Sequence, residues 1–416
     1  MEPGDRIRVT NNGEPVEGIL LPSSTDDHLV VKRDGGYNIG IDRESASVAI
    51  LEHNTVDMVV TEPATGAAST VVSDDSLPTI SLLSTGGTIA STVDYRTGAV
   101  SPRFDVEDVL TAVPELEGRA NYRGRVISNI LSENMRPAIW QSLAEAIAEE
   151  IAAGADGVVV MHGTDTMQFS ASAIAFMIDS PIPIVFTGSQ RSADRPSSDN
   201  VVNAVCAVEA ATSDIAEVII CMHAGGSDDR CALHRGTRAR KNHTSRRSAF
   251  ETVGQPPLGT VTYPEGDVSF RPGAIRHTRG DQTLSLTTDL NTDVALLKFV
   301  PGADANQVEA CTNRAGLVIE GTGLGHVNDE WLAAIESLPS DVPVVITSQC
   351  LEGRVCDRVY ETGRDMLEAG VIEAEDTLPE TAYVKLMWAI ENVEDVPATM
   401  KESLAGELTD SSRPWS

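Results

Sequence analysis

Lysine is scarce in this chain of 416 residues: only five of its 31 basic residues are lysines, against 62 Asp and Glu residues. With a net charge of −31, the chain lacks the basic face that non-specific nucleic-acid binding needs, and it also lacks a polybasic membrane anchor. The acidic residues are dispersed among apolar positions rather than gathered in blocks, which argues against disorder. Dispersed acid with little lysine is typical of a protein kept soluble in concentrated salt, where charge repulsion is screened.

Cysteine pairs and long apolar runs are missing as well. None of the six cysteines lies in a CxxC pair, so we expect buried reduced thiols rather than disulfides, and no metal site. No uninterrupted apolar stretch reaches membrane-spanning length, and the first residues show no basic segment followed by an apolar one. We therefore expect a cytoplasmic protein with no membrane partner.

The pattern of the chain predicts an α/β protein in four parts. Residues 1–60 alternate short β-like runs with Gly and Asn turns, which favours a small β-barrel. Residues 61–78 are rich in Thr, Ala, Ser and Asp without a helical stripe, and we expect a linker there. From residue 79 strands and helices alternate, which predicts doubly wound parallel sheets. We expect a larger α/β domain with the active site at 79–285 and a smaller one at 293–416.

Four predicted strand ends in the larger α/β domain carry small polar residues in place of bulky ones. They lie at residues 84–89, 162–167, 187–190 and 224–229. In open α/β sheets, ligands bind outside the carboxyl ends of the strands, so we expect the active site at this edge.

Taken singly, the motifs at these strand ends can be explained by structural roles instead of catalytic ones. The Thr-Gly-Gly-Thr sequence that ends at Thr88 lacks the lysine of a phosphate-binding loop and is more typical of a tight turn, although Gly87 would let the backbone pass close to a ligand. Thr164 and Asp165 directly follow a buried strand and could equally cap a helix. His162 could serve as a base for a neighbouring hydroxyl, but its place right after a buried strand favours a structural role.

One short stretch reverses the charge balance of the chain. Seven of the 31 Lys and Arg residues lie within residues 230–247, and we expect most of them to neutralise a neighbouring acidic surface. Lys241 stands alone among arginines there. Because lysine can lose its proton whereas arginine cannot, Lys241 is the candidate base.

Together the motifs resemble a known enzyme family. Residues 83–90 (Leu-Ser-Thr-Gly-Gly-Thr-Ile-Ala) and 162–167 (His-Gly-Thr-Asp-Thr-Met) are similar to the two signature motifs of the L-asparaginase/glutaminase family, in the expected order. The resemblance covers about residues 79–400 and implies a two-domain asparaginase-like fold. It also implies functional roles for eight residues: Thr88 as the usual nucleophile, Tyr95 to orient it, Thr164, Asp165 and Lys241 as a second triad, and Ser132, Glu133 and Gly87 at the substrate. Which threonine attacks first stays open, and Thr88 is favoured.

The N-terminal module narrows this resemblance. Simple asparaginases lack such a module, whereas the D subunits of archaeal glutamyl-tRNA(Gln) amidotransferases have a similar arrangement, and residues 129–135 and 240–247 also resemble that subgroup. The resemblance implies a glutaminase subunit, from a salt-adapted archaeon, of an ATP-dependent ligase used in protein biosynthesis. The alternatives are a freestanding L-asparaginase with an added β module and a non-catalytic binding scaffold.

For the partners, the same resemblance implies that this chain hydrolyses L-glutamine, or asparagine, and passes ammonia to the E subunit of the amidotransferase. The E subunit would use ATP and Mg²⁺ to convert Glu-tRNA(Gln) to Gln-tRNA(Gln), and it would make most of the contacts with the tRNA. The implied assembly is a heterotetramer built on a dimer of this chain, with no cofactor in this chain.

Overall fold

The computed structural model describes most of the chain after residue 112 and separate segments before it. The described residues are 5–10, 15–21, 28–32, 38–43, 45–53, 69–71, 74–86, 91–93, 100–102, 109–110, 113–191, 197–356 and 358–411.

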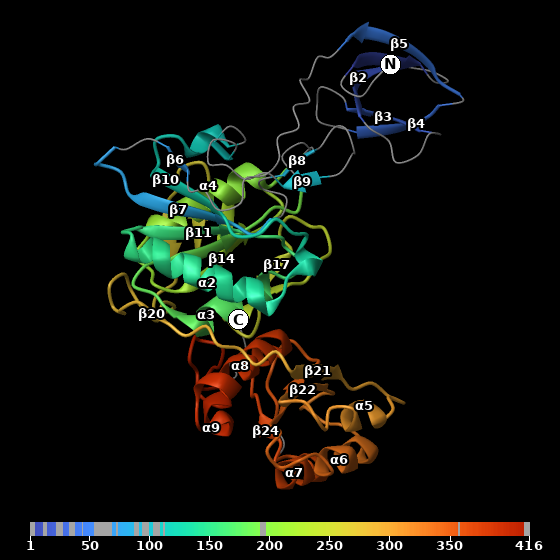
Figure 1. Ribbon diagram of the computed structural model, residues 1–416, viewed down its shortest axis with the longest axis vertical. Coiled ribbons are helices and arrows are strands. Elements are labelled where there is room, and N and C mark those ends of the chain that lie inside the picture. Colours follow the sequence, from blue (N-terminus) through green and yellow to red (C-terminus); the bar gives the residue numbers. More distant parts are fainter. Residues whose placement is uncertain are drawn as a thin grey trace.

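The N-terminal module is an antiparallel five-stranded sheet, and Figure 1 draws it apart from the rest of the molecule. Its strand order is β4-β3-β2-β1-β5. Ile7 and Val9 of β1 are buried while Arg8 between them is exposed, as the alternation of side chains along a strand requires. The predicted all-β module is confirmed. Its strands are β1 (Arg6–Thr10), β2 (Pro15–Leu21), β3 (His28–Lys32), β4 (Asn38–Asp42) and β5 (Ser47–Glu52).

The largest sheet has nine strands, in the order β19-β18-β15-β14-β13-β11-β7-β10-β6. Its five central strands are parallel: β14 (Val218–His223), β13 (Ile184–Thr187), β11 (Gly157–Met161), β7 (Thr79–Ser84) and β10 (Asn121–Val126). Antiparallel strands extend it at both sides: β15 (Arg230–Arg235), β18 (Gly259–Thr262), β19 (Val268–Phe270) and β6 (Ser69–Val71). The sheet is therefore mixed, and β6 lies in the segment 61–78 where we expected only a linker.

Helices cover both faces of this sheet. Val158 and Val160 of β11 lie in the core formed with α2 (Pro137–Ala152) and α3 (Met167–Met177). Val159 and Met161 lie in the core formed with α4 (Asn200–Thr212), on the opposite face. This arrangement confirms the doubly wound α/β fold class.

The C-terminal domain has a four-stranded parallel sheet, in the order β21-β22-β23-β24. Its strands are β21 (Val294–Lys298), β22 (Gly316–Gly321), β23 (Val344–Ser348) and β24 (Ile372–Glu373). One face packs on α5 (Asn306–Glu309), α6 (Asp329–Glu336) and α7 (Glu361–Glu368). The other packs on α8 (Pro379–Asn392), and α9 (Val396–Met400) follows. Buried residues of α8 and α3 belong to one apolar cluster, so the two α/β domains share a core.

Shorter elements complete the described structure. Three two-stranded sheets are formed by β8 (Ser91–Val93) with β9 (Val100–Pro102), β12 (Ile178–Asp179) with β20 (Ser285–Leu286), and β16 (Ala239–Lys241) with β17 (Phe250–Thr252). The short 3-10 helices are η1 (Pro114–Leu116), η2 (Ser132–Asn134) and η3 (Gly236–Arg238). Of the described helices, none is long and apolar enough to cross a membrane.

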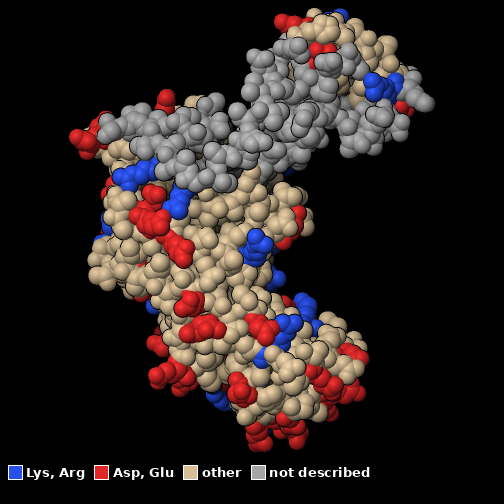
Figure 2. All heavy atoms as spheres, viewed as in Figure 1, with Lys and Arg blue, Asp and Glu red and all other residues tan. Residues whose placement is uncertain are grey.

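Acidic side chains are spread over the surface, as the composition requires. Figure 2 shows them scattered over both α/β domains and dense at the end of the C-terminal domain that carries α6 and α7. Exposed acids there include Asp329, Glu330, Glu361, Asp365 and Glu368. The cysteines are reduced in this structure, and four of the six are buried: Cys206, Cys221, Cys231 and Cys311.

Candidate active site

The carboxyl ends of the parallel strands meet at one edge of the large sheet. The Thr85 N–H, just after β7, donates to the Met161 carbonyl of β11 at 3.1 Å. The His162 N–H, just after β11, donates to the Thr187 carbonyl of β13 at 2.9 Å. Three of the four polar strand ends identified in the sequence are therefore adjacent.

Lys241 joins the second motif at this edge. Its Nζ lies 2.9 Å from Thr164 Oγ1 and 2.6 Å from Asp165 Oδ1. The Lys241 side chain is only 9% exposed, whereas that of Asp165 is 66% exposed. A hydroxyl, an amine and a carboxylate thus meet beside a solvent-exposed side chain. The separation of 77 positions between Thr164 and Lys241 hides this arrangement from any spacing rule. Only the family resemblance predicted it.

Ser132 completes this side of the site through Thr166, which we did not identify from the sequence. Ser132 Oγ lies 2.9 Å from Thr166 Oγ1 and accepts the Thr166 N–H at 3.0 Å. Gly163 allows this approach, because a Cβ built on it would lie 2.7 Å from Ser132 Cβ. Glu133, the other residue predicted at the substrate from this segment, is exposed in η2.

The first motif is described up to Gly86. Gly86 has φ +106°, and a Cβ there would lie 2.3 Å from the Ile130 carbonyl oxygen, so glycine is required on two counts. The predicted site residues Gly87, Thr88 and Tyr95 lie outside the described residues.

His162 has the surroundings of a structural residue. Its ring is buried, and Nδ1 donates to the Gly163 carbonyl at 2.6 Å, while Nε2 has no hydrogen-bond partner among the described residues. Burial lowers the pKa of the His162 imidazole to about 4, so the ring is neutral at pH 7. The structural interpretation of this residue agrees with its surroundings.

Three family profiles match this chain. "Asparaginase, N-terminal" matches residues 79–276, and "Glutaminase/Asparaginase C-terminal domain" matches residues 293–402. "GatD N-terminal domain" matches residues 1–51, the stretch in which the antiparallel module lies.

Relatives match the chain from end to end. The D subunit of the glutamyl-tRNA(Gln) amidotransferase of Halobacterium salinarum is 63% identical over 422 residues, covering 100% of this chain and 99% of that protein. The chain belongs to the family of glutamyl-tRNA(Gln) amidotransferase D subunits. The D subunit from Methanosarcina mazei is 50% identical, over 98% of each chain. The resemblance inferred from the motifs is confirmed.

Solved structures agree with the asparaginase-like fold of this member of the D-subunit family. The thermostable L-asparaginase from Thermococcus kodakarensis has a TM-score of 0.71 and 30% identity, covering 80% of this chain and 100% of that chain. L-asparaginase I from Vibrio cholerae has a TM-score of 0.69 and 28% identity, covering 80% of this chain and 99% of that chain. The predicted two-domain fold is confirmed, whereas the roles of individual site residues stay predictions.

The basic stretch at residues 230–247 of this chain is neutralised by acidic residues within the fold. Each of its seven cationic side chains lies within 4.0 Å of a carboxylate. The pairs are Arg230–Asp229, Arg235–Glu217, Arg238–Asp376, Arg240–Glu380, Lys241–Asp165, Arg246–Glu251 and Arg247–Asp228. This agrees with the neutralising role expected for most of them, and Lys241 differs by also contacting a hydroxyl.

A buried polar chain behind this edge was missed in the sequence. Asn203 of α4 accepts from His223 Nδ1 at 2.6 Å and donates to Asp199 at 3.0 Å. His223 Nε2 lies 3.1 Å from Asp228, which also pairs with Arg247. The hydrogen bond with His223 and the charge of Arg247 lower the pKa of the Asp228 carboxyl. This series of hydrogen bonds and ion pairs connects the loops after β13 and β14 to the loop after Lys241.

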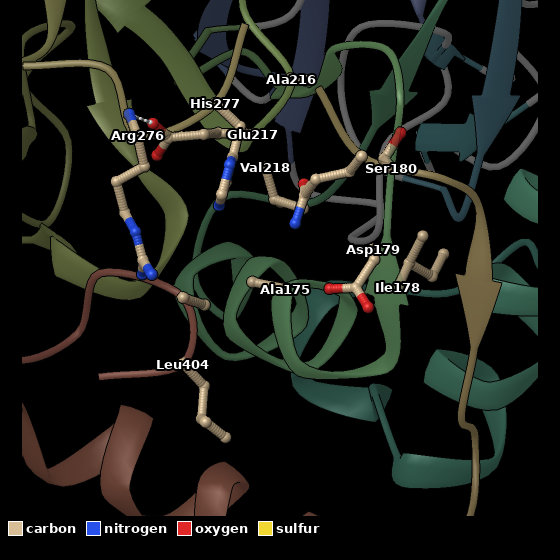
Figure 3. A pocket seen from close by; sticks show the side chains of 12 residues that line it. Ala175, Ile178, Asp179, Ser180, Ala216, Glu217, Val218, Arg276, His277 and Leu404 are labelled. Atoms are coloured by element: carbon tan, nitrogen blue, oxygen red, sulfur yellow. Dashed lines mark hydrogen bonds between the residues drawn. The ribbon is translucent and has the colours of Figure 1, made fainter. Parts of the chain in front are cut away.

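A pocket at the opposite edge of the sheet has a different character (Figure 3). It lies beside Asp179 of β12 and Glu217 before β14, close to Leu404 of the C-terminal segment. Glu217 already accepts from Arg235 Nε at 2.7 Å and from the Arg276 N–H at 2.5 Å. Because its central carboxylate is paired and it lies near the amino ends of the strands, this pocket is not the expected active site.

Proposed function

We propose that this chain is the glutamine-hydrolysing component of a tRNA-dependent amidotransferase. It releases ammonia from L-glutamine and passes it to a partner, the E subunit, which uses ATP and Mg²⁺ to convert Glu-tRNA(Gln) to Gln-tRNA(Gln). Membership of the D-subunit family over the whole chain supports this proposal. The observation that carries it is the contact of Lys241 with Thr164 and Asp165 at the carboxyl ends of the strands.

The proposed chemistry is acyl transfer through a threonine. The threonine Oγ1 attacks the side-chain amide carbon of glutamine, and its proton leaves to a base. The tetrahedral intermediate then breaks its C–N bond, the nitrogen takes up a proton, and ammonia leaves an acyl-enzyme ester. Water attacks the ester and releases glutamate and the free threonine. Backbone N–H groups beside residues 163–165 or 87–89 are candidates to stabilise the oxyanion.

Lys241 is the proposed base of this reaction. Its Nζ lies 2.9 Å from Thr164 Oγ1, within the range for direct proton transfer once the amine is neutral. Thr88 is the nucleophile that the family resemblance favours, and Thr164 is the alternative. Asp165 holds Lys241 at 2.6 Å and, being largely exposed, offers a negative charge to the α-ammonium of glutamine.

The surface charge of this chain is consistent with a proposed complex in which the partner subunit makes most of the tRNA contacts. The chain carries a net charge of −31, and the basic side chains of residues 230–247 are all paired with acids. Such a surface repels a nucleic-acid backbone, so we assign most tRNA contacts to the E subunit. The proposed assembly is a cytoplasmic heterotetramer built on a dimer of this chain.

The test compares active-site variants with matched controls by measuring ammonia release from glutamine. Thr88→Val, Thr164→Val and Lys241→Arg are made in the complex co-purified from the native extract. Lys241→Arg keeps the positive charge beside Asp165 but cannot act as a base, so we expect a loss in kcat of about 100-fold or more. Lys298→Arg, at an ion pair where the lysine is 58% exposed, and Thr244→Val, at an exposed loop threonine, should keep wild-type rates.

Two results would overturn parts of this proposal. Wild-type turnover by Lys241→Arg would remove Lys241 from the chemistry. A protein that purifies alone and hydrolyses asparagine without stimulation by Glu-tRNA(Gln) would instead be a freestanding asparaginase with an added β module.

A further inference from the structure

The short strand that carries Lys241 is held from its other side by the C-terminal domain. Arg240 and Lys241 are successive residues of β16, so their side chains project to opposite faces of the strand. Lys241 reaches Thr164, whereas Arg240 reaches Glu380 in the first turn of α8, with 3.3 Å between Nη1 and Oε2. A shift of β16 toward either face therefore changes both contacts.

Glu380 is built into the structure as a buried carboxylate. Its side chain is 6% exposed, Oε1 is buried without a hydrogen-bond partner among the described residues, and Oε2 contacts Arg240. Burial raises the pKa of the Glu380 carboxyl, and the charge of Arg240 opposes that rise. A half-satisfied buried carboxylate is costly to keep, which suggests a role beyond packing.

Contacts of neighbouring residues hold the start of α8 in place beside the site. Thr381 Oγ1 donates to the Thr237 carbonyl at 3.0 Å and lies 3.1 Å from Ser172 Oγ of α3. The helix α3 begins at Met167, directly after the Thr164–Thr166 motif. Arg238, two residues before Arg240, is fully buried against Asp376 at 2.6 Å. The start of α8 thus contacts both segments that supply the Lys241–Thr164 pair.

We propose that Glu380 is a positioning residue for Lys241: by holding Arg240 it fixes β16, and so fixes the distance between Lys241 Nζ and Thr164 Oγ1. The proposal rests on the proposed role of Lys241 as base. In this proposal, Glu380 makes no contact with the substrate. The C-terminal domain then contributes to the rate of glutamine hydrolysis through the placement of one amine.

The experiment measures kcat and KM for glutamine in the complex with Glu380→Gln, Arg240→Gln and the double variant. Gln keeps the size of the Glu380 side chain and removes its charge, so the fold is retained while the hold on Arg240 weakens. Because a displacement of about 1 Å at a catalytic group can cost two orders of magnitude in rate, we expect kcat to fall by about tenfold or more, with KM within about twofold. The double variant should be no slower than either single variant, because both remove one interaction.

Arg246→Gln is the matched control. It breaks the Arg246–Glu251 pair in the same β16–β17 hairpin, where both side chains are about half exposed, and it should leave kcat unchanged. Unchanged kcat in Glu380→Gln, or an equal loss in Arg246→Gln, would overturn the positioning role. If Glu380→Gln fails to fold, Arg240→Gln tests the same pair from its more exposed side. An active Lys241→Arg variant would refute the proposed role of Lys241 as base, whereas full activity of Glu380→Gln beside an inactive Lys241→Arg would refute this inference alone.

Discussion

Acid should destabilise this protein through two buried histidines, His162 and His234. Both rings are almost completely inaccessible, and burial lowers the pKa of each to about 4, from 6.5 in the unfolded chain. As the pH falls below 6.5 the unfolded state binds these protons first, so stability is full above pH 6.5 and is lost down to about pH 4. A difference of 2.5 units corresponds to about 3 kcal/mol for each histidine, with a slope near 1.4 kcal/mol per pH unit around the middle of this window.

His234→Asn isolates one of these contributions. His234 Nδ1 lies 2.8 Å from Thr252 Oγ1, and an Asn amide can place a polar atom in the position of Nδ1 without a titrating ring. We expect the variant to be less stable at pH 7 because it leaves a cavity, but its stability should fall less steeply with acid, by about 1 kcal/mol per pH unit. The assay is urea denaturation at several pH values between 6.5 and 4, at constant molar KCl. Parallel curves for wild type and variant would refute the reasoning, because they would mean that His234 takes up no proton on unfolding.

Three further predictions concern stability. Gly86→Ala should cost more free energy of unfolding than Gly154→Ala, by at least about 1 kcal/mol in calorimetry, because both glycines have positive φ but only Gly86 places its new Cβ against Ile130. Lys385→Met should cost about 3–5 kcal/mol by leaving the buried charge of Glu407 without its counter-ion, and adding Glu407→Gln should recover part of that loss; additive losses in urea denaturation would contradict this. Raising KCl from about 0.1 M to about 1 M should raise the thermal midpoint, because screening of the −31 net charge shortens from about 10 Å to about 3 Å; a falling midpoint would argue against salt adaptation.

Local patterns predicted the repeating elements of the large domain well. The alternation of strands and helices predicted from residue 79 is observed in elements such as β11 and α2, because a strand buried on both faces and a one-sided helix leave clear periodicities. The polar residues at the strand ends lie together at one edge of the sheet, as predicted, since parallel strands place their carboxyl ends together.

Pairings between distant residues left no such signal. The antiparallel strands β15 and β18 were not predicted, because a strand's direction follows from its partner rather than from its own sequence. The three-residue strand β6 is too short to show alternation. The Arg240–Glu380 pair joins residues 140 positions apart, and tertiary contacts such as the shared core of α3 and α8 bring them together.

The scarcity of lysine takes on a different meaning in the structure. Of the five lysines, Lys241 and Lys385 have nearly inaccessible side chains, and each meets several acceptors. Lys241 donates to Thr164 and Asp165, whereas Lys385 contacts Glu407 and donates to the Met400 carbonyl. An ammonium is a compact charge with three donors on a flexible stem, and a planar guanidinium cannot reproduce that geometry in a small buried space. On an acid-rich surface lysine has no such advantage, and there Asp and Glu provide solubility. Lys298 and Lys401 are exposed, so the scarcity of lysine does not confine it to buried positions. Of the two buried lysines, Lys241 is the one placed beside a hydroxyl.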